Sequence, residues 1–431
     1  IENVTFENNI PSTVYNEETE QFIDETAWDV SASQDKSIIA WYETSNSNGA
    51  LKVHIGSNDD MYANQNSSEL FAYIGYADIC TATDVITNIG LLNTSNVTDM
   101  SLMFDNTGYV AMTSLNLGDK FNTSNVTDME FMFYNTGFKA MTSLNLGDKF
   151  DTSNVTDMCY MFSGTRQLTS LDLGDKFDTS KVTNMRSMFN GTYKLESLDL
   201  GDKFDTSKVT DMSHMFYGIN LTSLDLGDKF DTSKVTSMYG MFWNANQLTS
   251  LDLGDKFDTS KVTNMSYMFY GKLKLTSLDL GDKFDTSNVN GMENMFGAMY
   301  VLTSLNLGNK FDTSNVTNMN EMFKSTGIYV MTTLDLGPAF TKIADTNTDM
   351  FRRTGKDGLI IYAPESIYKS KTSFKLSSTD TTTEEGAITV TEITGVTIVP
   401  KYKPEWTLEG ATIDTANKAL KINVKGATKA G

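Results

Sequence analysis

The stretch LDLGDKFDTSKVTNMSYMF, from Leu251 to Phe269, decides the fold of this 431-residue chain, because it returns with small changes through more than half of it. Its first thirteen residues are identical in the copies that begin at Leu171, Leu198 and Leu224. Successive copies lie 26 to 29 residues apart, and a fixed period of this length is typical of solenoids and other repeat architectures. The first leucines of the copies are Leu115, Leu144, Leu171, Leu198, Leu224, Leu251, Leu278, Leu305 and Leu334.

Each copy predicts a short β-strand followed by a short helix. Around Leu278 the leucines alternate with a polar residue, as in a strand with one buried face, and Gly281 ends this strand. The segment Asp285-Thr-Ser-Asn that follows is typical of helix starts. In the preceding copy, Met265, Met268 and Phe269 fall on one side of a predicted two-turn helix. Because the Met-Phe pairs recur in register with the leucines, we expect them to fill a core rather than form an exposed groove.

Stacking the copies would place their strands side by side in a parallel sheet, with neighbours about 4.8 Å apart. Nine copies would then build a solenoid on the order of 45 Å long, in which each repeat contacts mainly its neighbours.

The L-x-x-L-x-L strand followed by FDTS[NK]VT and a Met-Phe pair resembles the BspA-like leucine-rich repeat of bacterial surface proteins. The resemblance covers about Asn93 to Phe351, and the segments from Ala27 to Glu43 and from Tyr62 to Phe71 resemble the region ahead of such repeats. It implies a capped solenoid of the leucine-rich-repeat type in a secreted or cell-surface protein. Members of that family, often called adhesins, bind molecules of a host or a neighbouring cell, so the resemblance implies a class of activity without a ligand.

The pattern divides the chain into five segments. Residues 1–25 are predicted to be a strand or tether, and residues 26–92 to cap the N-terminal end of the stack. The leucine-rich-repeat solenoid is expected over residues 93–355, with a C-terminal cap over residues 356–376. Residues 377–431 alternate apolar and polar positions and predict a small β-rich module with a linker.

Charge and composition exclude several partners. The formal net charge of -21 disfavours nucleic acid and anionic membrane surfaces. No run of 18 apolar residues is present, so membrane insertion is not expected, and no signal peptide or wall-anchoring tail is visible, so export rests on the resemblance. The two cysteines, Cys80 and Cys159, are either free thiols or a bridge between the N-terminal region and the third repeat. With His54 and His214 as the only histidines, the sequence offers no ligand set for zinc or a redox metal.

One polar position recurs between the two strand leucines and predicts an exposed acidic ladder. Like charges opposite each other on neighbouring strands are destabilising, so the lysines of the adjacent GDK turns, which form a parallel column, are expected to offset them. A row of bound calcium ions is the sharper alternative to a solvated face. The five consecutive aspartates of the ladder are Asp172, Asp199, Asp225, Asp252 and Asp279.

The turn after each Met-Phe pair varies, and three consecutive repeats place Tyr217, Trp243 and Tyr270 there, with Tyr239 and Tyr267 just before. Aromatic side chains on solvent-facing turns would make rigid contact surfaces for sugars or proteins. The alternative is that they tuck back over the edge of the predicted helix. We take these five residues as the candidate ligand-binding residues.

Catalysis has little support in the sequence, because no nucleophile elbow, P-loop or dinucleotide-binding glycine motif occurs in the required context. The predicted function is that of a non-catalytic bacterial adhesin whose solenoid face binds a host or microbial surface protein or glycan. The alternative is the structural subunit of an extracellular filament or surface layer that self-associates through terminal β-segments, since unpaired strands invite strand addition.

Overall fold

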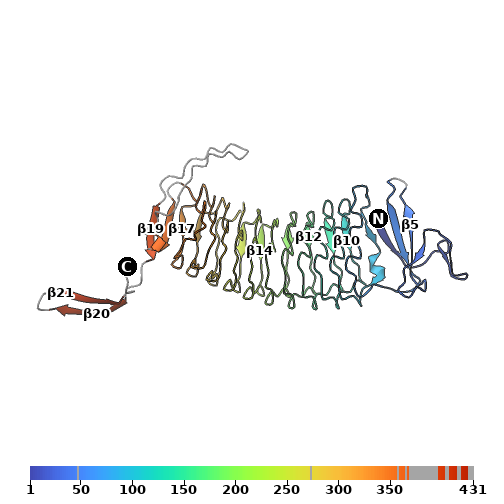
Figure 1. The fold of residues 1–431 in the computed structure, drawn as a ribbon, viewed down its shortest axis with the longest axis horizontal. Coiled ribbons are helices and arrows are strands. Elements are labelled where there is room, and N and C mark those ends of the chain that lie inside the picture. The colour runs from blue at the N-terminus through green and yellow to red at the C-terminus, as the bar shows by residue number, and fades with distance from the viewer. Residues whose placement is uncertain are drawn as a thin grey trace.

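The computed structural model shows an elongated stack of repeats with a small sheet across its N-terminal end (Figure 1). The stack has no helix long and apolar enough to cross a membrane anywhere in the residues described. The structure describes residues 1–45, 48–271, 274–356, 359–364, 366–367, 397–402, 407–414 and 419–425.

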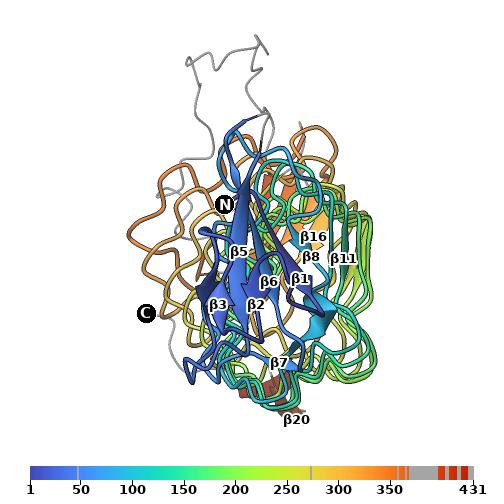
Figure 2. The same cartoon turned by 90° about the vertical axis from the view of Figure 1, so that its right-hand side faces the viewer.

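The N-terminal end is a five-stranded sheet in the order β4-β5-β6-β1-β8. Strand β1 (Asn3–Glu7) lies between β6 (Leu51–Gly56) and β8 (Ile86–Thr87) and pairs with both in parallel, while β4 (Trp28–Asp29) and β5 (Ile39–Thr44) complete the sheet in antiparallel fashion. A small hairpin, β2 (Tyr15–Asn16) with β3 (Gln21–Phe22), packs nearby. Figure 2 looks along the stack and shows this sheet lying across its near end. The first residues are therefore an internal strand of the cap and not a tether.

The stack begins inside the segment predicted to be only a cap. Strand β7 (Met61–Tyr62) pairs in parallel with β9 (Leu92–Asn93), which follows the short 3-10 helix η1 (Ile89–Leu91). Residues 66–73 already have the backbone of a repeat, because Phe71 N–H donates to Met103 O at 2.9 Å, as one repeat does to the next. The coil geometry thus starts ahead of the predicted boundary at residue 93.

Short strands repeat along the stack with equivalent residues opposite each other, so that Leu224 faces Leu251 and Asp225 faces Asp252. The predicted parallel pairing of the strand leucines is confirmed for Leu115 with Leu144, Leu171 with Leu198, Leu224 with Leu251 and Leu305 with Leu334. These strands are β10 (Ser114–Asn116), β11 (Ser143–Asn145), β12 (Ser170–Leu171), β13 (Ser197–Leu198), β14 (Ser223–Asp225), β15 (Ser250–Asp252), β16 (Ser304–Asn306) and β17 (Thr333–Asp335).

At the C-terminal end, β18 (Ile360–Pro364) pairs with β17, as expected for a closing strand, but β19 (Thr397–Tyr402) then continues the parallel sheet. Residues on both sides of the predicted boundary at 377 therefore share one sheet. Strands β20 (Thr407–Asp414) and β21 (Ala419–Lys425) form a separate antiparallel hairpin, and the predicted polar bridge over residues 377–386 lies outside the described residues.

The predicted helix in each repeat is wrong. In the repeat around Phe216, alternate backbone N–H groups donate to the next repeat: His214 to Tyr239 O at 2.8 Å and Phe216 to Met241 O at 2.9 Å. The N–H groups between them close i to i−3 turns, and His214 is left-handed with φ 57°. In a helix, these N–H groups would bond within their own segment, which is too short to form a stable helix alone. In the turns, the same groups bond to the next repeat, so each repeat is stabilised by its neighbours.

The core confirms the interpretation of the Met-Phe pairs. Every such methionine and phenylalanine from Met100 to Phe323 is 0% exposed. The phenylalanine rings stack from repeat to repeat, from Phe104 to Phe351, with centroids 5.3–5.9 Å apart. Buried threonines of the FDTS segment link the repeats as well: Thr259 Oγ1 donates to Asp285 O at 2.8 Å and accepts from Asp285 N–H at 2.8 Å. The Asp-Thr-Ser cluster thus joins repeats instead of starting a helix.

Candidate binding surface

The turn ladder that replaces the predicted helices positions the candidate binding residues. In the repeats around Phe216 and Phe269, the left-handed residue before the Met-Phe pair and the residue after it are half-buried, whereas the methionine and phenylalanine between them are fully buried. His214 and Tyr267 occupy the first of these columns, and Tyr217, Trp243 and Tyr270 the second. Side chains from neighbouring repeats are therefore brought together at the spacing of the ladder.

The five predicted residues form one cluster around Trp243. Its ring centroid lies 4.6 Å from that of Tyr267 in a stacked arrangement, and 5.3 Å from Tyr217 and 5.9 Å from Tyr270 edge to face. Tyr239 is 5.6 Å from Tyr267. All five are half-buried, so each ring packs against its neighbours and still reaches solvent. The structure thus combines the two alternatives, since the rings tuck together and remain at the surface.

Sequence reasoning missed His214 and Glu293 as members of the cluster. The His214 ring stacks on Trp243 at 5.9 Å and lies 5.0 Å from Tyr239, and burial, helped by the charge of Arg186, lowers the pKa of the histidine. Glu293 Oε1 accepts a 2.9 Å hydrogen bond from the hydroxyl of Tyr267. Burial together with this bond raises the pKa of Tyr267 to about 12. An alignment of the repeats could have identified His214, because it occupies the same repeat position as Tyr267.

A second row of aromatic residues, on the loops that lead into the strands, was missed entirely. Tyr76 lies 4.9 Å from Tyr109, which stacks on Phe138 at 4.5 Å. The guanidinium of Arg166 lies 4.0 Å above the Phe138 ring and 5.3 Å from that of Tyr193. This row runs from the N-terminal cap to the fourth repeat.

The two rows join at Gly218. A methyl group added to this glycine would lie 2.4 Å from Cε1 of Tyr193, so the Tyr193 ring rests on the Gly218 backbone, directly beside Tyr217. Together the rows make one continuous surface, which we call the aromatic belt, and it crosses seven repeats. It consists of Tyr76, Tyr109, Phe138, Arg166, Tyr193, His214, Tyr217, Tyr239, Trp243, Tyr267 and Tyr270.

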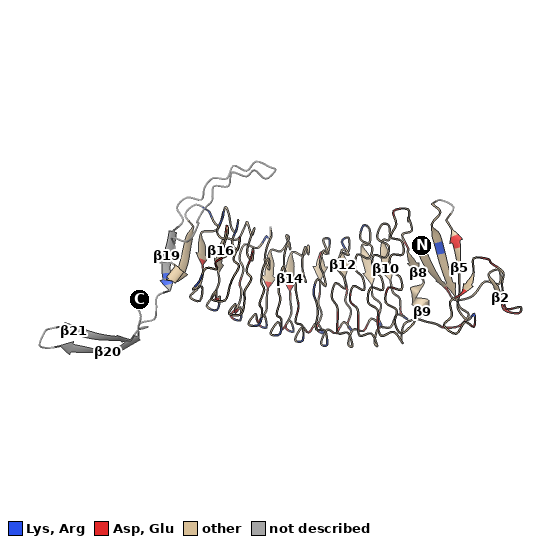
Figure 3. Cartoon of the chain, in the orientation of Figure 1, with Lys and Arg blue, Asp and Glu red and all other residues tan. Residues whose placement is uncertain are grey.

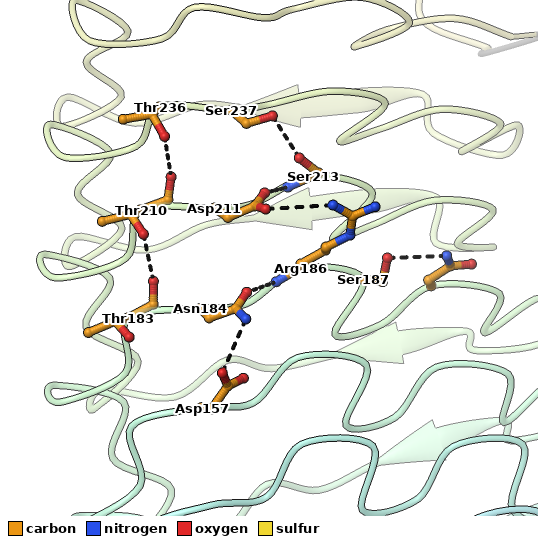
Figure 4. Close-up of polar contacts among 11 residues, drawn as sticks. Asp157, Thr183, Asn184, Arg186, Ser187, Thr210, Asp211, Ser213, Thr236 and Ser237 are labelled. Atoms are coloured by element: carbon orange, nitrogen blue, oxygen red, sulfur yellow. Dashed lines mark hydrogen bonds and ion pairs between the residues drawn. The ribbon is translucent and has the colours of Figure 1, made fainter.

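A polar ladder beside the belt fixes the turns that carry it (Figure 4). Asp211 Oδ1 accepts the N–H of Ser213 at 2.8 Å, and Asn184 does the same for Arg186 at 3.1 Å. The Asn184 amide also donates to Asp157 Oδ2 at 3.2 Å. Arg186 reaches Asp211 at 3.9 Å, so the charged groups next to His214 are paired with each other. These bonds hold the backbone of successive turns in register.

The aspartates of the acidic ladder are exposed and lie at or just after the ends of the short strands, as at β14 (Figure 3). Each of the five aspartates accepts a 2.9 Å hydrogen bond from the glycine N–H two residues later, for example Asp225 from Gly227. The repeated aspartate is therefore explained by the turn that it stabilises.

The lysine column does not offset this ladder, contrary to expectation. No ion pair joins the two among residues 1–45, 48–271 and 274–356. The lysines act on the FDTS aspartates instead: burial alone would raise the pKa of Asp151, but hydrogen bonds from Ser153 and the charges of Lys176 and Lys203 lower it. The calcium alternative gains no support. Within the described part of the chain, no three His, Cys, Asp or Glu side chains lie close enough together to hold a metal ion.

Both cysteines are buried and free, which confirms the free-thiol alternative. Burial, with the charges of Asp157 and Glu130, raises the pKa of Cys159 to about 12. A thiol of this kind is a poor nucleophile, so Cys159 is a core residue.

Comparison with known proteins gives a family. The model described as "Mycoplasma protein of unknown function, DUF285" matches residues 79–145, 136–251, 219–329 and 249–354. These overlapping matches span residues 79–354, more than half of the chain. The chain belongs to this family. No curated protein and no solved structure matches it.

Within the DUF285 family region lie all the strands from β10 to β17 and almost the whole aromatic belt. The match begins at residue 79, again ahead of the predicted start of the repeats. The family description assigns no activity and does not mention BspA-like repeats.

Proposed function

We propose that the protein is a non-catalytic adhesin of the bacterial cell surface or its surroundings, a leucine-rich-repeat solenoid of the BspA-like kind. The single observation that carries the proposal is the aromatic belt, which is continuous over seven repeats although its members alternate between two loop columns. An uninterrupted row of aromatic side chains at a surface is the composition expected of a binding site.

Packing within the belt supports a binding role. Each ring is held by its neighbours, so a partner that docks there would lose little side-chain entropy on the side of the protein. Burial and the neighbouring Tyr217 raise the pKa of Tyr193, while burial and Glu293 raise that of Tyr239, so these hydroxyls stay protonated at neutral pH. The belt therefore offers hydrogen-bond donors beside apolar rings, which suits a surface protein or a glycan as partner.

The alternative of a filament or surface-layer subunit loses one of the two features that motivated it. That proposal relied on a strand-rich C-terminal segment and on a loose N-terminal strand, but β1 is paired on both sides, with β6 and with β8. Its removal would also take Val4 and Phe6 out of the core, so truncation of residues 1–25 would test folding rather than assembly. Adhesion through the belt is the better supported function.

The test is attachment of the labelled 431-residue protein to bacterial and to epithelial cells. We expect the triple variant Tyr217→Ala, Trp243→Ala, Tyr270→Ala to bind at least about tenfold more weakly, since truncated aromatic hot spots cost about 2 kcal/mol or more. The matched control is Tyr300→Ala with Tyr329→Ala, which removes exposed tyrosines outside the belt. Equal attachment of the wild type and the triple variant would show that the belt is not the attachment site, provided that thermal unfolding curves show both proteins to be folded.

A further inference from the structure

A strip of solvent-accessible side chains runs along the stack next to the aromatic belt. In each repeat it begins at the asparagine or lysine that follows the Thr-Ser pair, and it passes through a second threonine to the polar ladder. Figure 4 shows this threonine column and the polar ladder side by side. Thr210 Oγ1 donates to Thr183 O at 3.2 Å and Thr236 Oγ1 to Thr210 O at 3.1 Å, so equivalent side chains of successive repeats lie close together. The charged strip, as we call it, consists of the accessible residues within 96–101, 125–130, 154–159, 181–186, 208–213, 234–239 and 261–266.

The charge of the strip changes sign in its middle. Its first three repeats carry four carboxylates and no cation, a formal charge of -4. Its next four repeats carry five cations and one carboxylate, a formal charge of +4. The charged residues of the acidic half are Asp99, Asp128, Glu130 and Asp157, and those of the basic half are Lys181, Arg186, Lys208, Asp211, Lys234 and Lys261.

The acidic half has no counter-charge of its own. None of its four carboxylates takes part in an ion pair within the described part of the chain. Burial, with the charges of Asp99 and Asp157, raises the pKa of Asp128, and burial with the charges of Asp157 and Asp128 raises that of Glu130. These carboxylates therefore repel one another, and a cation brought close to them would relieve the repulsion.

The basic half is also unpaired over most of its length. Arg186 lies 3.9 Å from Asp211, the one ion pair between strip residues that the structure describes. Lys181 Nζ donates to the neutral side chain of Asn154 at 2.6 Å. The other three lysines are exposed, and no ion pair among the described residues includes them. Their charges are open to a partner.

Charges beside the strip do not cancel this pattern. On one side, burial would raise the pKa of Asp231 in the FDTS segment, but hydrogen bonds and the charges of Lys256 and Lys283 lower it. The aspartates of that margin therefore have cations of their own. On the side of the belt, the Arg166 guanidinium lies against aromatic rings and not against the acidic half.

A two-fold axis fits this distribution of charge. If the axis crosses the strip between the repeats of Asp157 and Lys181, the acidic half of one copy lies on the basic half of a second copy, and symmetry repeats the pairing on the other side of the axis. Because both copies have the same repeat spacing, opposite charges stay in register over several repeats. Glu69, on the coil ahead of the acidic half, then faces the repeat of Lys261, and Glu293 lies beyond the overlap.

We propose that the protein forms a dimer in which two copies lie side by side and antiparallel along the charged strip, with acidic half against basic half. Exposed ion pairs are individually weak, so the affinity comes from the number of pairs, each of which the symmetry doubles. This association goes beyond adhesion through the belt and does not depend on it.

The net charge of -21 opposes the approach of two copies at long range, which makes the dimer sensitive to salt in a characteristic way. At physiological ionic strength the Debye length is about 8 Å, so distant charges are screened while pairs in contact still attract. At about 1 M salt it falls to about 3 Å, and the contact pairs are weakened too. A dimer held by apolar contacts would respond in the opposite direction.

The experiment is sedimentation velocity of the 431-residue protein at about 0.15 M and about 1 M sodium chloride. Two variants exchange residues between equivalent positions of the repeats, so each new side chain already stands at that position elsewhere in the stack. The basic variant combines Asn96→Lys, Asp99→Asn, Asn125→Lys, Asp128→Asn, Asn154→Lys and Asp157→Asn. The acidic variant combines Lys181→Asn, Asn184→Asp, Lys208→Asn, Lys234→Asn, Ser237→Asp, Lys261→Asn and Asn264→Asp. The control, Asn288→Lys with Asn315→Lys, adds lysines to the same column beyond the strip.

We expect the wild type and the control to dimerise at about 0.15 M salt, with a dissociation constant at least about tenfold higher at 1 M. Each charge variant alone should associate at least about tenfold more weakly than the wild type, because its strip carries mostly one sign and like charges meet. An equimolar mixture of the two variants should form a heterodimer, which also shows that both are folded. A wild type that stays monomeric up to about 100 µM, a dimer that tightens with salt, or a mixture that stays monomeric would overturn the inference.

Discussion

Replacing Phe216 with alanine is expected to destabilise the protein by about 3–5 kcal/mol, the usual cost of emptying a fully buried phenylalanine site. The ring is 0% exposed and stacks on Phe189 at 5.9 Å and on Phe242 at 5.7 Å. Because each repeat contacts mainly its neighbours, a cavity in the middle of the stack weakens the coupling between its two halves. We therefore expect urea unfolding, followed by circular dichroism, to change from one transition to two.

Phe216→Leu is the matched control, since it keeps most of the apolar volume and should cost less than the alanine variant with a single transition. Tyr217→Ala, at the adjacent half-buried position, should cost less than Phe216→Ala as well. If Phe216→Ala unfolded like wild type, the stacked phenylalanine column would not be what couples the repeats.

The second large effect is expected for Gly147→Ala. This glycine ends its strand with φ 78°, and an added methyl would lie 2.5 Å from the carbonyl oxygen of Gly118 in the preceding repeat. The left-handed conformation costs an alanine about 1–2 kcal/mol. Overpacking against rigid backbone adds about 1–3 kcal/mol more. Thermal unfolding should show the combined loss.

Gly174→Ala separates the two contributions. Gly174 has φ 75° in the next repeat, and nothing lies within 4 Å of its added methyl. It should therefore show the conformational cost alone. Equal losses for the two variants would mean that the close approach of Gly147 to Gly118 does not exist in solution.

The repeated leucines, the buried Met-Phe pairs and the parallel register were all readable from the sequence, because each depends on one residue meeting its own equivalent in the next repeat. The contrast between Gly147 and Gly174 was not readable. Both glycines stand at the same position of the repeat. The contact between Gly147 and Gly118 coincides with a spacing of 29 residues from Leu115 to Leu144, whereas the next repeat, which contains Gly174, has a spacing of 27.

The helix prediction failed for a physical reason. Met265, Met268 and Phe269 satisfy a helical period and a ladder of tight turns equally well, since both bring positions three apart to one side. The two structures differ in the acceptors of the backbone N–H groups, because His214 N–H bonds to Tyr239 O of the next repeat and not to its own segment. The sequence pattern within one repeat does not reveal which acceptor is used.

Five of the eleven residues of the aromatic belt were predicted from the sequence and six were missed. Tyr217, Trp243 and Tyr270 share one repeat column, so internal comparison picked them out. Tyr109 and Tyr193 lie in loops of different length, and their connection to the first group depends on a ring resting on Gly218. Such contacts between columns follow from side-chain packing and not from the period.

The measurement that tests the central claim most directly compares Gly218→Ala with Gly227→Ala for attachment to cells. Both glycines are left-handed, with φ 69° and 76°, but only the Gly218 methyl would displace the Tyr193 ring. Both variants should lose about 1–2 kcal/mol of stability. We expect Gly218→Ala to attach at least about tenfold more weakly, a loss of about 1.4 kcal/mol, while Gly227→Ala stays close to wild type. Wild-type attachment by both variants, or equal loss in both, would contradict a single continuous aromatic binding surface.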